Sequence, residues 1–266
     1  MIKKICIGII LFAVCKTGYA NVGDTLTNKK FNRFFFAASG GLAVPVGKFN
    51  TYERYGSASF VTGNNYAAAP KLGFNGKIEV MYLLLKKLGL ICTYYSSSNK
   101  ANSLSKDTLF PYNPYGGRGG GSGVNSSIYK AKNWATNGIL LGIAAHLKGD
   151  GYSINFKISG GWQQVKSPEI RIDGSGYWWN ISPASGTYTF AIIQPSMTSY
   201  NFVLSGGADI RVKLVKKLGL IISADYLNSF ASFNGNLIDQ NGNKTPNSFT
   251  MQISLFLFNM GICYQF

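Results

Sequence analysis

Residues 71–84, KLGFNGKIEVMYLL, alternate between two kinds of side chain. The even positions, from Leu72 to Leu84, are apolar or glycine, whereas the odd positions are mostly charged, polar or small. A period of two is the pattern of a β-strand with one apolar and one polar face. Residues 152–162 and 201–214 repeat this pattern, so we expect an all-β fold.

The mature chain contains eight runs of this kind. They cover residues 33–47, 70–85, 88–98, 134–147, 152–165, 199–214, 218–230 and 249–266. Strands of soluble proteins are usually about 5–6 residues long. A tilted strand that crosses a membrane needs about 9–11 residues, and each of these runs is long enough.

The connections between the runs are of two lengths. The short ones lie at 86–87, 148–151 and 215–217, and the long ones at 48–69, 99–133, 166–198 and 231–248. This asymmetry predicts a transmembrane antiparallel up-and-down β-barrel of eight strands, with three short periplasmic turns and four long extracellular loops. Segments 169–173 and 187–193 also alternate. They either extend a hairpin above the membrane or raise the number of strands to ten.

Residues 1–20 have the pattern of a secretory signal peptide. Lys3 and Lys4 precede a short apolar run, and small residues end it at Ala20. A lipoprotein anchored through Cys15 is disfavoured, because the bulky Val14 precedes this cysteine. We expect cleavage after Ala20, with a barrel domain over 21–266.

The charge of the chain is strongly positive but scattered. Its 266 residues include 26 Lys+Arg and 10 Asp+Glu, a net charge of +16, and removal of the three lysines of the signal peptide leaves +13. Basic residues occur in turns, on polar strand faces and in loops, without the single stripe expected for nucleic-acid binding. We therefore expect no nucleic-acid partner.

No cofactor or metal site is expected. After removal of the signal peptide, Cys92 and Cys263 are the remaining cysteines, which make neither a metal cluster nor a disulfide framework. The stretch GGRGGGSG at 116–123 lacks the Lys-Ser/Thr ending of a phosphate loop and is predicted to be a flexible loop tip.

The chain resembles the small outer-membrane β-barrel proteins of Bacteroidota, with a porin-like or PorT-like barrel, and more distantly the OmpA and OmpX barrels. The resemblance rests on the signal peptide, on GGLAVPVGKF at 40–49, on KKLGL at 86–90 and 216–220, and on the ending Tyr264-Gln265-Phe266. It implies a bacterial outer-membrane location among lipid and lipopolysaccharide. It also implies that the barrel assembly machinery reads Tyr264 and Phe266 as an assembly signal. It implies no particular activity.

An inward polar face would place charged side chains in the barrel lumen. An eight-stranded barrel is just wide enough for its own side chains, and buried charges need partners. We expect a lumen charge network in which three acids pair with three bases: Glu79, Asp209 and Asp225 with Lys77, Lys157 and Arg211. Lys71 and Lys213 are also expected to face the lumen. Such charges either plug the lumen or line an ion pathway, and we favour the plug.

Catalysis is not expected. The single histidine, His146, falls on the lumen side with no visible partner for a Ser/His/Asp arrangement. The aromatic residues of the long loops, such as Tyr177 and Trp178-Trp179, either bind an unknown protein or glycan or lie in the interfacial girdle. We predict a non-enzymatic outer-membrane barrel with a structural or interaction role through its loops and a lumen filled by polar and charged side chains. The alternative is a small solute channel or transporter.

Overall fold

The computed structural model describes residues 33–49, 69–101, 121–179 and 185–266. The predicted signal peptide and its cleavage site lie outside these residues, so both stay predictions. No helix in the described part of the chain has the length and apolarity to cross a bilayer.

The described residues form eleven strands and one short 3-10 helix. Eight strands make a barrel: β1 (Phe34–Pro45), β2 (Pro70–Leu85), β3 (Leu88–Ala101), β5 (Trp134–Lys148), β6 (Tyr152–Lys166), β9 (Thr198–Lys213), β10 (Leu218–Asp239) and β11 (Lys244–Gln265). The remaining elements are β4 (Gly121–Ala131), β7 (Ile170–Trp179), β8 (Ser185–Gln194) and the 3-10 helix η2 (Gly47–Phe49).

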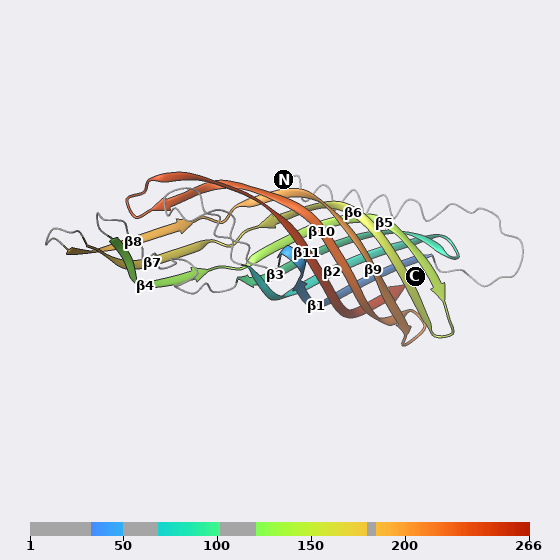
Figure 1. Cartoon of the computed structure of the whole chain (residues 1–266). Coiled ribbons are helices and arrows are strands. Elements are labelled where there is room, and N and C mark those ends of the chain that lie inside the picture. Colours follow the sequence, from blue (N-terminus) through green and yellow to red (C-terminus); the bar gives the residue numbers. More distant parts are fainter. Residues whose placement is uncertain (1–32, 50–68, 102–120, 180–184) are drawn as a thin grey trace, which may run out of the picture. The chain divides into compact units, whose positions relative to one another are not determined.

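The eight strands close on themselves. They pair antiparallel in the order β1, β2, β3, β5, β6, β9, β10 and β11, and β11 pairs back with β1 from Gln265 opposite Phe35 to Leu255 opposite Pro45 (Figure 1). The predicted eight-stranded up-and-down barrel is confirmed. The ten-strand alternative is wrong, because β7 and β8 pair with each other outside this ring.

The alternation along each strand separates an apolar outer surface from the interior. On β2, Phe74 and Ile78 are exposed, whereas the intervening Lys77 is buried. Large apolar residues are exposed in the same way on the other strands: Leu42, Leu90, Leu141, Ile143, Phe156, Ile158, Leu204, Ile210, Ile222, Phe258, Met260 and Ile262. A continuous outward apolar band of this kind is the lipid-facing surface of a transmembrane barrel.

One of the predicted long loops is instead a tight hairpin. β10 and β11 continue to Asp239 and Lys244, so residues 231–248 are not a loop, and the turn covers only 240–243. One carboxylate oxygen of Asp239 accepts hydrogen bonds from the backbone N–H groups of Asn241 and Asn243. The side-chain amide of Asn243, followed by these backbone groups, lowers the pKa of Asp239. Gly242 completes the turn with a φ of +81°.

Two other predicted loops contain strands. Region 99–133 holds β4, and region 166–198 holds β7 and β8, which pair antiparallel in the order β4, β7, β8 (Figure 1). We call these three strands the loop-end sheet. It joins β10 where Ile193 lies opposite Ile238. The predicted loop tip at 116–123 is corrected in part, because residues 121–123 begin β4 and residues 116–120 lie outside the described chain.

Close approach of two strands requires glycine at position 161. A Cβ atom added to Gly161 would lie 2.0 Å from the backbone carbonyl oxygen of Ile139, whereas one added to Gly76 would meet nothing within 4 Å. We expect Gly161→Ala to lower the free energy of unfolding by about 1–3 kcal/mol and Gly76→Ala to change it by less than about 0.5 kcal/mol. Denaturant unfolding of both refolded variants in detergent micelles checks this. Equal losses would contradict the strand spacing.

Candidate functional site

Six charged side chains lie together inside the barrel. Alternate inward positions on four strands supply three bases and three acids. All six are buried: Lys77 and Glu79 on β2, Lys157 on β6, Asp209 and Arg211 on β9, and Asp225 on β10. We call these six residues the lumen network.

One guanidinium joins opposite walls of the barrel. Arg211 Nη2 donates to Glu79 Oε1 at 2.8 Å, and Arg211 Nε donates to Asp209 Oδ1 at 2.9 Å. In the ring, β9 and β2 are four strands apart in both directions. The contact between Arg211 and Glu79 therefore spans the lumen.

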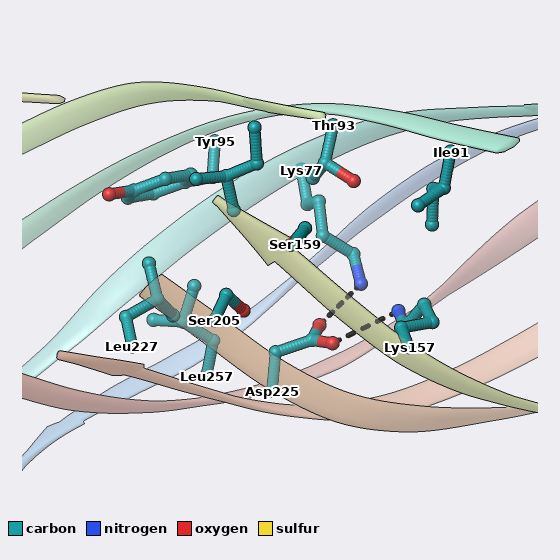
Figure 2. Close-up of a pocket in the computed structure, with 11 residues that line it drawn as sticks. Lys77, Ile91, Thr93, Tyr95, Lys157, Ser159, Ser205, Asp225, Leu227 and Leu257 are labelled. Carbon is teal, nitrogen blue, oxygen red and sulfur yellow. Dashed lines mark hydrogen bonds and ion pairs between the residues drawn. The ribbon is translucent and has the colours of Figure 1, made fainter. Parts of the chain in front are cut away.

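Two lysines connect all three carboxylates. Lys157 Nζ lies 3.0 Å from Glu79 Oε2, 3.3 Å from Asp209 Oδ2 and 3.0 Å from Asp225 Oδ1. Lys77 Nζ lies 2.6 Å from Asp225 Oδ2, and Figure 2 shows both lysines reaching this carboxylate. Three positive and three negative groups are thus in mutual contact, which compensates the cost of burying each charge.

A polar chain continues from the network towards the turn end of the barrel. His146 Nδ1 lies 2.7 Å from Asn155 Oδ1, and Asn155 Nδ2 donates to Asp209 Oδ1. The ring of Phe35 packs against both this histidine and Arg211. The ring centroids of Phe35 and His146 are 5.8 Å apart, and Arg211 Cζ lies 5.1 Å from the Phe35 centroid. His146 thus helps to position Asp209. The described residues contain no group of three or more His, Cys, Asp or Glu side chains arranged to hold a metal ion.

The loop-side half of the lumen contains a cluster of buried apolar side chains beside buried polar ones such as Ser97, Asn99 and Thr136. Tyr95 donates a hydrogen bond to Gln163. On the loop side of this pair, the rings of Trp134 and Phe233 pack with their centroids 5.9 Å apart. The rings of Phe233 and Phe249 stack with their centroids 4.9 Å apart. Together with their buried neighbours these rings form an apolar plug: Phe49, Val165, Met197, Val203, Leu227, Ile253, Leu255 and Leu257. The predicted filling by polar and charged side chains did not include these apolar residues, which pack beside the buried polar ones.

Two further predicted lumen charges lie outside the buried interior. Lys71 and Lys213 are exposed near strand ends, so neither belongs to the lumen network.

A small cavity remains beside the network. It lies between Lys77, Lys157 and Asp225 on one side and Tyr95 and Leu227 on the other (Figure 2). Its volume is about 10 Å³, which is enough for about one water molecule. A cavity of this size does not accommodate a solute.

Aromatic side chains mark both edges of the apolar band. Trp162 and Phe202 pack edge to face on the loop side, and the ring of Phe266 contacts Phe34 and Tyr264 on the turn side. The predicted assembly residues Tyr264 and Phe266 both face outward there. The backbone of Tyr177–Trp179 belongs to the loop-end sheet, and these side chains lie outside the described part of the structure.

Solved structures similar to this chain are outer-membrane proteins. A major outer membrane protein from Thermus thermophilus is 14% identical, with a TM-score of 0.46 over 89% of this chain and 100% of that chain. Ail of Yersinia pestis is 10% identical, with a TM-score of 0.39 over 88% and 99%. The protease OmpT of Escherichia coli is 10% identical, with a TM-score of 0.35 over 91% and 99%.

No family model and no curated protein matches this chain. The resemblance to the Bacteroidota barrels therefore stays a prediction. At the identities and TM-scores above, the likeness to solved structures carries no conclusion about activity.

Removal of one lysine from the lumen network should destabilise the barrel. Lys157→Met leaves three buried carboxylates short of a cation, so we expect a loss of about 3–5 kcal/mol of unfolding free energy. Lys132→Met is the matched control, because Lys132 pairs at 2.9 Å with Glu169 in an exposed ion pair, which contributes at most about 1 kcal/mol. Urea unfolding in one detergent compares them, and similar losses would contradict the central place of Lys157.

Proposed function

We propose that this chain is a non-enzymatic integral protein of the bacterial outer membrane whose barrel is closed to solutes. In this proposal the barrel is an anchor, and the loop-end sheet and the β10–β11 hairpin bind a protein or glycan outside the cell. Lipid and lipopolysaccharide surround the barrel, and the barrel assembly machinery inserts it.

The observation that carries the proposal is the contact of Arg211 with Glu79 across the lumen. A solute at this level would have to separate buried ion pairs and leave charges without partners. Breaking one buried pair by removing a partner costs about 3–5 kcal/mol. The apolar plug of Trp134, Phe233 and Phe249 then closes the loop-side half of the lumen.

The strands beyond the barrel support a role outside the membrane. β10 and β11 have 22 residues each, about twice the length that a membrane crossing needs. The loop-end sheet adds backbone pairing over three further strands. Paired strands hold side chains in fixed positions, so this region presents an ordered surface of the kind that binding requires.

Electrical recording distinguishes this proposal from the channel alternative, which rests on the charged lumen and its water-sized cavity. Refolded protein, verified by heat-modifiable gel migration, is added to planar bilayers. We expect no conductance steps of the size of an open porin. Such steps would contradict the closed barrel and favour a channel.

Photo-crosslinking on intact cells tests the second half of the proposal. A photo-reactive side chain is placed at the exposed Thr187 or Thr189 of β8, and at the exposed Asp150 of a short turn as the matched control. We expect a discrete adduct from the two β8 positions that the turn position does not form. Equal adducts from all three positions, or none from β8, would contradict a partner at the loop-end sheet.

The proposed assembly signal makes a separate prediction. Deletion of Phe266 removes an outward aromatic ring at the end of the last strand, so we expect much less protein to reach the outer membrane in cells. Phe258→Ala, on the same face of β11, is the control. Both variants should refold equally in detergent, because neither side chain enters the lumen. Normal outer-membrane fractionation without Phe266 would contradict the signal.

A further inference from the structure

The turn end of the barrel carries a dense set of exposed lysines. They lie in the three short turns and the strand ends that flank them: Lys86, Lys87, Lys148, Lys213, Lys216 and Lys217. Asp150 is the acidic residue in these segments. Because the turns join β2 to β3, β5 to β6 and β9 to β10, they are distributed around the barrel. We call these six lysines the turn-end lysines.

The four lysines of the first and last of these turns lie directly beside the lipid-facing band. Leu85 and Leu88 flank the first pair, and Val215 and Leu218 flank the last pair, and all four apolar side chains are exposed. One or two residues along a strand correspond to about 3–7 Å. The ammonium groups therefore lie just beyond the hydrocarbon level, where lipid phosphates lie.

The chain supplies little of its own negative charge at this rim. Within the described residues, ion pairs involve lysines and arginines of the lumen and the loop end, such as Lys77, Lys132 and Arg171, and none involves a turn-end lysine. Lys217 lies near an interfacial ring instead, with Nζ 5.8 Å from the centroid of Tyr264.

We propose that the turn-end lysines bind the headgroups of anionic phospholipids in the leaflet on the turn side of the barrel. Six lysines against one aspartate complement a negatively charged surface, and the long lysine stems allow apolar contact below and phosphate contact above. This site is separate from any partner of the loop-end sheet. It fixes the depth of the barrel in the membrane from the end opposite to that sheet.

Lipid selectivity measures this binding directly. The full barrel is reconstituted in phosphatidylcholine bilayers with spin-labelled phosphatidylglycerol or spin-labelled phosphatidylcholine, and the relative association of the two lipids is measured by electron spin resonance. At low salt we expect phosphatidylglycerol to be favoured by at least about fivefold, the effect of about one lysine–phosphate contact. At high salt the ratio of phosphatidylglycerol to phosphatidylcholine association should fall towards one.

Three variants make the test specific. The turn variant K86Q/K87Q/K216Q/K217Q should lose most of the preference, and K86R/K87R/K216R/K217R should keep it. The matched control K100Q/K130Q/K166Q/K244Q removes four exposed lysines from the loop end of the protein. It should keep the preference for phosphatidylglycerol as well. Heat-modifiable migration verifies that each variant is folded. The proposal is overturned if wild type shows no preference, or if the turn and control variants lose it equally.

Discussion

The compensation of charge inside the lumen is the constraint on which the barrel depends. Arg211 reaches Glu79 across the barrel, and Lys157 contacts three carboxylates. These contacts exist only while β2, β6, β9 and β10 keep their register. A slip of one residue in β2 would turn Lys77 and Glu79 towards lipid and apolar side chains towards the network. The ion pairs therefore select one register of the closed sheet, even where their net contribution to stability is modest.

The interior is closed by two different kinds of packing. At mid-height the side chains are charged and hydrogen-bonded, and a polar chain through Asn155 and His146 supports Asp209 from the turn side. Towards the loops the inward positions include a cluster of aromatic and aliphatic side chains, with Phe233 stacked on Phe249. An apolar plug excludes water without needing partners, whereas the charged layer requires each of them. If the barrel is closed as proposed, the strands outside the membrane are the part of the described chain that is left to meet a partner.

Most of the barrel could be predicted because lipid imposes a rule on every second residue. Wherever a strand crosses the membrane, the outward side chain must be apolar, so the bounds of β2, β5 and β6 follow from alternation alone. Beyond the membrane the outward side chains meet water and need not be apolar, so alternation does not predict the continuation of β10 to Asp239. The plug was missed for the opposite reason, since inward residues such as Leu255 are as apolar as their outward neighbours. The partner of His146 lies on an adjacent strand, which sequence spacing does not reveal.

The balance of the lumen network also determines where the charge of the protein acts. Three bases and three acids cancel inside the barrel, so the net charge of +16 is carried entirely by residues outside this network. A basic composition is therefore no sign of an anion-selective pore here. Lysine has three roles in the same fold: Lys157 is buried and paired, Lys132 pairs in water with Glu169, and Lys86 and its neighbours extend beyond an apolar edge. Because the surroundings of each ammonium group decide its role, the excess positive charge of the described residues lies at the two ends of the barrel, where we propose that headgroups and an external partner bind.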